Sequence, residues 1–352
     1  MVTPVKVKDE LEAKRREAVL LIEEHGSPSK AAIASGIPRQ TIISRVMAAQ
    51  AHNRAEPAVP EPAIELPTFP DENLPIEQII GYMSNSFVKR WESHKAHTWF
   101  TVKVKDKKPI GILWMGDPHL DDNGCNWPVL QKHIEICNKT PGIWTSNIGD
   151  TTNNWSGRLV HLYSKQDTSL KTAQRLAAWF MLEAGLKWLV FLIGNHDAWG
   201  DGAGVLAQMA KRYGTQQLVC HDWEARFILE FPNAAQFRIH AAHNFKGHSQ
   251  WNPMHGPMKA AMLGQEAHLL VCGDKHNWGV FRFENAERNL TQTLLRVRGY
   301  KFLDDHTRHL GIQEQQDGCS ILTIFDPSNP GSVLAFDDIE QGAEYLTWLR
   351  SK

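Results

Sequence analysis

The sequence has 352 residues, more than a typical single domain, so we expect a main domain with a smaller attached unit. Lysine and arginine total 38 against 39 aspartate and glutamate, so net charge gives no argument for a nucleic-acid or membrane partner, and any such affinity has to be local. The five cysteines are scattered, and neither an apolar signal region nor a run of about 18 apolar residues occurs, so we expect a cytoplasmic protein with no membrane partner.

Residues 1–50 are typical of a small all-α unit. The segment LEAKRREAVLLIEEHG predicts a helix that ends at Gly26. Ser27 and Pro28 start a second helix that ends at Gly36, and a third helix follows. Two short helices joined by a glycine-bearing turn indicate a helix-turn-helix domain.

The third of these helices is predicted to contact DNA. Residues 27–50 contain lysine and arginine and no acidic residue, so this segment is locally basic. The side chains able to reach base edges or phosphates are Arg39, Gln40, Thr41, Ser44 and Arg45. We therefore expect nucleic acid as a partner; the alternative is a helical hairpin that docks on another protein.

Residues 51–75 differ in composition from the segments around them. Six prolines among acidic and small residues predict an extended linker. A helix predicted over 76–100 then leads into a catalytic domain that we assign to residues 76–352.

The catalytic domain first alternates strands with helices. Helices are predicted over 127–139, 169–187 and 202–214, and from 217 onward the pattern is mostly strands. Alternating units followed by a β-rich half predict an α/β fold in which two packed sheets are flanked by helices.

Four motifs place polar side chains directly after apolar runs. They are GDPH at 116–119, GDTTN at 149–153, GNHD at 194–197 and GDKH at 273–276. Each reads as a strand end followed by a loop, so carboxylates, imidazoles and an amide should meet at one rim. Oxygen and nitrogen donors without a thiolate suit two neighbouring divalent metal ions. We expect manganese, with magnesium, iron or zinc as alternatives.

The order of these motifs resembles that of the calcineurin-like metallophosphoesterases, over roughly residues 108–330. This resemblance implies a two-sheet metallophosphoesterase sandwich with the metals where the strand ends meet. The layout with an N-terminal helix-turn-helix also resembles phosphoesterases encoded in phage and prophage genomes.

The resemblance implies a role for each ligand. The first metal would take Asp117, His119 and His276, and Asp150 would bridge both metals. The second metal would take Asn195 and a histidine from the strand FRIHAAH, where both His240 and His243 are candidates. We favour His243 because it stands at the strand end, whereas His240 lies three residues earlier and would point to the other face.

The last motif departs from the family pattern. In the resembled family this motif is usually G-H-x-H, whereas this chain has Asp274 in place of the first histidine. If Asp274 coordinates the second metal, the site is richer in carboxylates and prefers manganese or magnesium over zinc. In the alternative, Asp274 faces away, and the second metal binds weakly or uses His248 or His255 instead.

The resemblance implies that His196 is the general acid for the leaving group. Many relatives steady this imidazole with a carboxylate at the position that Asn153 occupies here. The Asn153 amide is expected to orient the ring less strongly. Asp197 is expected to brace its loop.

Substrate contacts are predicted from cationic side chains after the metal motifs. The segment 244–260 is predicted to be a loop, and the candidates are Arg158, His248, His255 and Arg298. Arg296, Arg298 and Lys301 alternate along RVRGYK, as a cationic row tracking a polynucleotide would, or as a solvated edge strand would.

The sequence thus predicts a two-metal phosphoester hydrolase. A phosphodiesterase or nuclease that cleaves DNA with a metal-bridging hydroxide fits the predicted DNA-binding head best. A phosphomonoesterase or protein phosphatase would use the same metal chemistry. A DNA-binding regulator with an inactive phosphoesterase body is the alternative of another class, and the oligomeric state stays open.

Overall fold

A computed structural model describes residues 4–52, 74–96, 99–212, 218–302 without 248, 250 and 265, and 317–352. The chain divides into two compact units, residues 1–79 and 80–352. Most of the linker expected at 51–75 lies outside the described residues, so the predicted domain boundaries remain a prediction.

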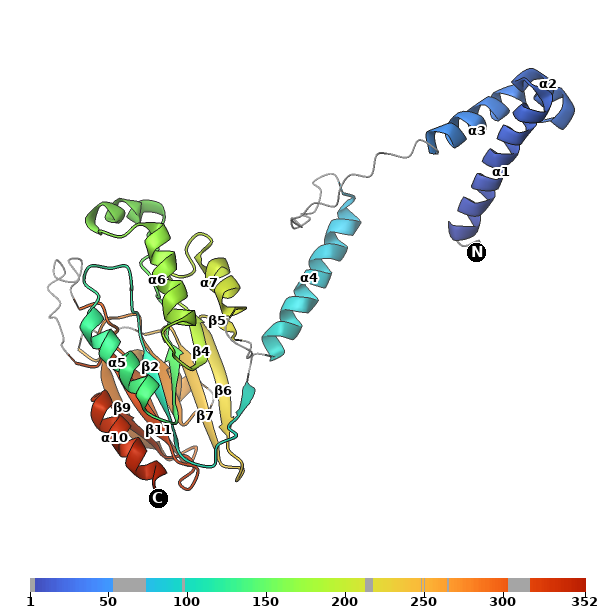
Figure 1. Ribbon diagram of the computed structural model, residues 1–352. Coiled ribbons are helices and arrows are strands. Elements are labelled where there is room, and N and C mark those ends of the chain that lie inside the picture. Colours follow the sequence, from blue (N-terminus) through green and yellow to red (C-terminus); the bar gives the residue numbers. More distant parts are fainter. Residues whose placement is uncertain are drawn as a thin grey trace. The chain divides into compact units, whose positions relative to one another are not determined.

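The N-terminal unit consists of three helices, α1 (Pro4–His25), α2 (Pro28–Ser35) and α3 (Arg39–His52), drawn in blue in Figure 1. Ser27 caps α2, and Gly36 ends it with a left-handed φ of 70°. Ala18, Ala31 and Ile42, one from each helix, are fully buried and form its core.

The helix α4 (Ile76–Ala96) is shorter than the helix predicted over 76–100. Phe100 instead begins strand β1 (Phe100–Lys103), in which half-buried and exposed side chains alternate. That two-residue period is typical of a strand with one face against a core. The chain therefore forms a strand where the helix was predicted to continue to residue 100.

One six-stranded sheet has the order β12-β11-β2-β3-β4-β5. Strands β2 to β5 are parallel, and β11 pairs with β2 in the antiparallel sense. Their bounds are β2 (Ile110–Met115), β3 (Ile143–Asn147), β4 (Trp188–Ile193), β5 (Cys220–Asp222), β11 (Ser320–Phe325) and β12 (Val333–Phe336).

The second six-stranded sheet has the order β1-β6-β7-β8-β10-β9. Strands β7, β8 and β10 are mutually parallel, so their carboxyl ends lie at the same edge. Their bounds are β6 (Glu224–Glu230), β7 (Gln236–Ala242), β8 (Leu269–Cys272), β9 (Gly279–Asn285) and β10 (Leu290–Arg296).

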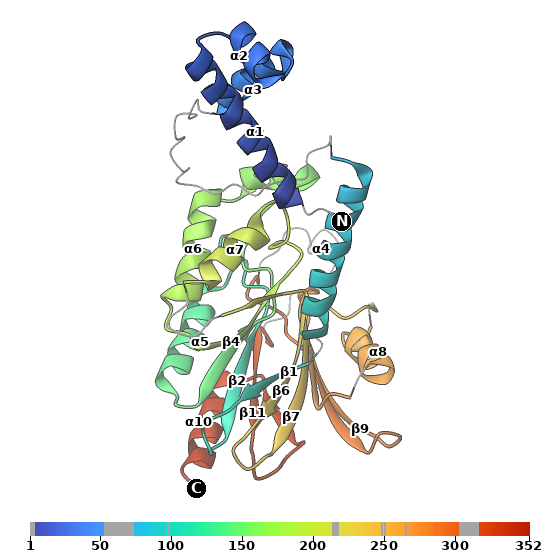
Figure 2. The same cartoon turned by 90° about the vertical axis from the view of Figure 1, so that its right-hand side faces the viewer.

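The main core lies between the two sheets. Strand β2 is apolar throughout because both of its faces are covered. Ile112 and Trp114 pack into the layer between the sheets, whereas Leu113 and Met115 pack toward the helices. Figure 2 shows α5 and α10 on one side of the sheets and α8 on the other.

The flanking helices are α5 (Trp127–Lys139), α6 (Leu170–Leu182), α7 (Gly202–Ala210), α8 (His255–Leu263) and α10 (Ile339–Arg350), with a short 3-10 helix η1 (Gly157–Lys165). Helix α5 has the predicted bounds, and α6 and α7 end earlier than predicted. Helix α8 corrects the prediction that 244–260 is all loop, and α10 and β12 were not predicted.

The fold class, an α/β two-sheet sandwich flanked by helices with a small helical N-terminal unit, is confirmed.

Within the described part of the chain, we find no helix that combines the length and apolar character needed to cross a lipid bilayer.

Candidate metal centre

The predicted ligands converge at the carboxyl ends of strands from both sheets. Seven of them form what we call the metal rim: Asp117, His119, Asp150, Asn195, His243, Asp274 and His276. The first four follow β2, β3 and β4, and the last three follow β7 and β8. Parallel strands within each sheet deliver the side chains to one edge, so residues 157 positions apart, such as Asp117 and Asp274, come together.

Two groups of donor atoms at the rim overlap at Asp150. One consists of His119, Asp150 and His196, and the other of Asp117, Asp150 and His243; within each group the donor atoms lie within 4.8 Å of one another. Asp150 Oδ2 is 4.0 Å from His119 Nε2 and 3.4 Å from His243 Nε2. A carboxylate shared by two donor groups is the arrangement that a bridged pair of cations requires.

The remaining predicted ligands lie against these two groups. Asn195 Oδ1 is 2.9 Å from His243 Nε2. The ring of His276 lies 5.5 Å from the ring of His119, centre to centre. The first donor group also contains His196, which the sequence assigned to catalysis rather than to metal binding.

Several buried donor atoms at the rim fit a bound cation. Asp117 and His119 are at most 1% exposed, and Asp117 Oδ1 and both ring nitrogens of His119 have no hydrogen-bond partner. A buried polar atom without a partner is costly, so such atoms are rare unless an ion or water satisfies them. Their donor types, carboxylate oxygen and imidazole nitrogen, suit a divalent transition metal or magnesium.

The clustered carboxylates of the rim favour a positive charge among them. Burial, reinforced by Asp150 and Asp274, raises the pKa of Asp117 well above its usual range, although His243 acts in the other direction. Burial would lower the pKa of His243, but Asp150, Asp117 and Asp274 together raise it to about 10. Clustered carboxylates thus stabilise any cation placed among them, which is what a divalent ion would provide.

The backbone at the rim is held in a rarely populated conformation. The φ angles of Asp117, His119, Asp150, Asp274 and His276 are 32°, 41°, 51°, 68° and 48°. Residues with a side chain adopt such values at a cost of about 1–3 kcal/mol each, and they cluster at functional sites. Because five predicted ligands share positive φ angles, we infer that the loop conformations orient these side chains toward the rim.

Glycines before the ligands allow the loops to approach closely. A Cβ added to Gly194 would lie 2.2 Å from Asp150 Oδ1, and one added to Gly149 would lie 2.6 Å from His243 Nδ1. Gly149 also has a φ of 119°. The glycines of GDTTN and GNHD are therefore required by the packing of one ligand loop on another.

Asp274 points into the rim. Its Oδ1 lies 3.7 Å from His243 Nε2, while Oδ2 accepts hydrogen bonds from Asn244 Nδ2 at 2.6 Å and pairs with Lys275 Nζ at 2.8 Å. One carboxylate oxygen is thus directed toward His243, and the other is held by Asn244 and Lys275. This position favours Asp274 over His255 as a ligand; His248 lies outside the described residues.

The two candidate histidines of β7 and its end have different environments. His243 is fully buried among the rim carboxylates, and its Nδ1 contacts the main-chain oxygen of Ile148 at 3.0 Å. His240 instead pairs with Glu224 at 3.0 Å and with Arg226. The geometry therefore places His243, and not His240, at the metal rim.

His196 is held by a backbone group rather than by the Asn153 amide. Its Nδ1 lies 2.5 Å from the main-chain oxygen of Asn153. The Asn153 side chain donates instead to Asp122 Oδ2 and Gln166 Oε1, at 2.8 and 3.0 Å. This corrects the expectation that the amide orients the ring: the loop carbonyl does so, and the amide fixes the loop.

Asp197 braces the two loops that carry Asp150 and Asn195. It is 2% exposed and accepts hydrogen bonds from the backbone nitrogens of Thr151 and Gly194, at 2.9 and 3.0 Å. Burial and the charge of Asp150 raise its pKa to about 7. These contacts agree with the loop-bracing role expected for it.

Of the predicted substrate residues that the structure describes, Arg158 and His255 are exposed and Arg298 is buried. Arg158 and His161 are exposed on η1, where His161 Nδ1 contacts the main-chain oxygen of Arg158, and His255 is exposed at the start of α8. Arg298 is only 3% exposed; its guanidinium lies 4.1 Å from the centre of the Phe302 ring and bonds to main-chain oxygens. Arg298 is therefore corrected from a substrate contact to a buried structural residue.

The cationic row predicted along RVRGYK is likewise buried. Arg296 donates to the main-chain oxygens of Pro253 and Gly273, both at 2.7 Å. Lys301 pairs with Asp122 at 3.0 Å. These cations hold loops next to the rim and do not form a track for a polynucleotide.

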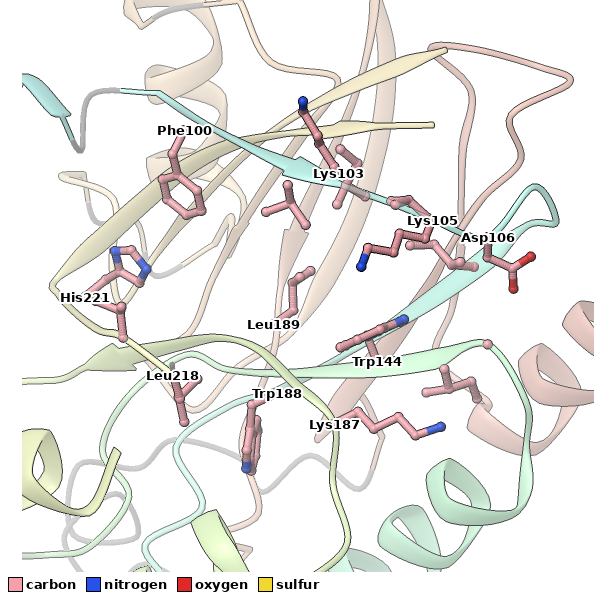
Figure 3. A pocket seen from close by; sticks show the side chains of 17 residues that line it. Phe100, Lys103, Lys105, Asp106, Trp144, Lys187, Trp188, Leu189, Leu218 and His221 are labelled. Carbon is pink, nitrogen blue, oxygen red and sulfur yellow. The ribbon is translucent and has the colours of Figure 1, made fainter. Parts of the chain in front are cut away.

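A separate cavity of about 770 Å³ opens between the sheets at the opposite end of the strands. It is lined by residues at or near the amino ends of β2, β3 and β4 together with β1 and β5, and Figure 3 shows Phe100 and His221 facing each other in it. Since catalysis is expected at the carboxyl ends, this cavity is not the metal site.

Three tryptophans beside the rim were not singled out by the sequence. Trp155 and Trp199 pack on the ring of His196, at 5.2 and 4.1 Å between ring centres, and Trp223 packs on His243 at 5.1 Å. Trp155 and Trp199 follow GDTTN and GNHD within two residues in the sequence. That short distance from the motifs could have marked them as neighbours of the site.

Comparison of the sequence with protein-family models and with curated proteins found no match. Solved structures similar in fold include NAD nucleotidase of Haemophilus influenzae, at 13% identity and a TM-score of 0.36, covering 64% of this chain and 49% of that one. The chain thus spans about half of that protein. The calcineurin-like phosphoesterase YfkN of Bacillus subtilis has 11% identity and a TM-score of 0.35, covering 70% of this chain and 100% of that one.

A metallophosphoesterase of Sphaerobacter thermophilus has 14% identity and a TM-score of 0.31, covering 69% of this chain and 99% of that one. The solved proteins to which this chain is similar therefore include two named as phosphoesterases and one named as a nucleotidase.

Proposed function

We propose that this protein is a metal-dependent phosphoester hydrolase that cleaves phosphodiesters in DNA. The observation that carries this proposal is the pair of donor groups that share Asp150, with His196 beside them. Neighbouring divalent cations in such a site activate water near neutral pH and neutralise the charge of a phosphoryl group.

The chain's own residues supply the binding framework. Asp117, His119 and His276 would hold one cation, and Asn195, His243 and Asp274 the other, with Asp150 between them. Manganese is the ion that we propose, because three carboxylates make the site hard while the imidazoles still favour a transition metal.

His196 would donate the proton that the leaving oxygen needs. A carbonyl only accepts hydrogen bonds, so the contact with the Asn153 oxygen places a hydrogen on Nδ1 and leaves Nε2 to transfer the second proton. Packing against Trp155 and Trp199 restricts the ring further. His196 is thus oriented before substrate binds.

The choice of DNA rests on the N-terminal unit. Residues 27–50 carry no acidic residue, and Arg39, Gln40 and Ser44 are exposed on α3, with Thr41 and Arg45 half-buried. A linked DNA-binding unit raises the local concentration of a substrate only when that substrate is part of DNA.

Turnover of several esters by the full chain with Mn²⁺ tests the proposal. We expect bis-p-nitrophenyl phosphate and DNA to be cleaved faster than p-nitrophenyl phosphate. Asp150→Asn should abolish cleavage, whereas Asp337→Asn, an exposed aspartate between β12 and α10, should leave it unchanged. Faster cleavage of the monoester would support a phosphomonoesterase instead. DNA binding without turnover of any ester would support a DNA-binding regulator.

A further inference from the structure

Trp223 stands at the metal rim in a conformation that its bulk disfavours. It connects β5 to β6 with a φ of 65°, in the left-handed region that large side chains rarely adopt. Yet 41% of the residue is exposed, so burial of the indole does not offset this strain. An exposed indole held at such a cost needs another explanation.

Backbone contacts fix Trp223 between β4 and a metal-rim histidine. Its nitrogen donates to the main-chain oxygen of Ile193 at 3.3 Å, and its oxygen accepts from the backbone nitrogen of His243 at 2.8 Å. Its ring lies edge-on to the His243 ring, at 5.1 Å and 78°. The indole is therefore anchored beside the donor group of Asp117, Asp150 and His243.

The other two rim tryptophans serve a different purpose. Trp155 and Trp199 are half-buried against His196, and Trp155 Nε1 donates to Gln166 Oε1 at 2.8 Å. If His196 protonates the leaving group, these two tryptophans lie on the leaving-group side of the site. Trp223 packs instead on His243, which belongs to the other donor group.

We propose that Trp223 is a stacking platform for a planar ring, a nucleobase, on the retained side of the phosphoester. This inference rests on the proposed function and narrows its substrate class to nucleotidyl esters. An indole face accepts any base, so the platform adds affinity without sequence preference. That property suits an enzyme whose sequence selection, if any, comes from a separate DNA-binding unit.

Two esters with the same leaving group isolate the platform. Thymidine 5′-(p-nitrophenyl phosphate) and methyl p-nitrophenyl phosphate both release p-nitrophenolate and differ in the retained group. With Mn²⁺ and the full chain, Trp223→Ala should raise KM for the thymidine ester about tenfold and leave kcat within about twofold. KM for the methyl ester should not change, and Trp223→Phe should restore most of the affinity.

Trp348→Ala is the matched control, since Trp348 is 51% exposed on α10 and lies outside the rim. Equal effects of Trp223→Ala on both esters, or no effect on either, would overturn the proposal. Unchanged manganese content in each variant would show that the rim itself is intact.

A binding measurement keeps this inference separate from the proposed function. Calorimetry with thymidine 5′-phosphate and with deoxyribose 5-phosphate compares a ligand with and without the base. Trp223→Ala should weaken only the nucleotide, by about tenfold. If the wild-type chain hydrolyses neither ester, the proposed function fails while this comparison still decides the role of Trp223.

Discussion

Asp274 stands where the resembled family carries a histidine, and we propose that it is a ligand of one of the two cations. One of its oxygens faces His243, while Asn244 and Lys275 hold the other. Asp274→Ala should therefore weaken one cation site and leave the other occupied. Manganese content after dialysis should fall from two ions per chain toward one. Two ions bound with unchanged affinity would show that the carboxylate is not a ligand.

His196 should affect rate more than metal binding. Because its ring is fixed by the Asn153 carbonyl and by two tryptophans, its loss removes an oriented proton donor. We expect His196→Ala to lower kcat on DNA by about 10²–10⁴-fold. The loss should be smaller for p-nitrophenyl esters, whose leaving group needs no proton. Loss of one manganese ion in this variant would instead make His196 a ligand, since it also belongs to a donor group.

Among the secondary structure elements, α5 carries a buried histidine, His133, whose surroundings favour the neutral form. His133 Nδ1 contacts Tyr300 Oη and Ser320 Oγ, both at 2.9 Å, and burial lowers its pKa to about 4. The unfolded chain takes up this proton near pH 6.5, so the contribution is complete above that pH and is lost as pH falls toward 4.

The measurement is urea unfolding of the wild-type chain and His133→Gln between pH 7.5 and 4.5. The stability advantage of the wild type should shrink by about 2–3 kcal/mol over this range. Other titrating groups cancel in the difference. An advantage that does not depend on pH would contradict a neutral, buried His133.

Strand ends were predictable from the sequence because the signal is local. A short apolar run such as IGILWM followed by Gly-Asp marks a buried strand and its loop, and those loops carry the candidate ligands. The burial of Arg296 was not predictable, because its guanidinium bonds to the main-chain oxygens of Pro253 and Gly273, which lie 43 and 23 residues earlier in the chain. The burial of Arg298 against Phe302 likewise has no counterpart in the pattern of charges along RVRGYK.

The role of the Asn153 carbonyl was not predictable either. Every residue has a main-chain oxygen, and the sequence does not show which of them faces His196. The sequence did not mark Trp223 as a candidate site residue, because its unusual φ angle is visible only in the structure.

The chain joins two compact units that differ in size and content. The N-terminal three-helix unit has a small core of its own, whereas the larger unit carries the metal rim. If the first unit binds DNA, it should contribute affinity and the second unit chemistry. Changes in one unit should then leave the intrinsic function of the other intact.

Arg39→Ala with Arg45→Ala tests this division. The double variant should bind duplex DNA more weakly and show a smaller salt dependence, by about one to two charges. Turnover of bis-p-nitrophenyl phosphate should stay unchanged. Lys14→Ala, which removes a charge from α1, is the control. Unaltered DNA affinity in the double variant would assign the N-terminal unit another task.

Anomalous diffraction from crystals grown with Mn²⁺ would locate the cations themselves. We expect two manganese peaks about 3.5–4 Å apart, with Asp150 coordinating both. Asp117 and His119 should contact one peak, and Asn195 and His243 the other. A single peak, or peaks away from Asp150, would contradict a two-metal site bridged by Asp150.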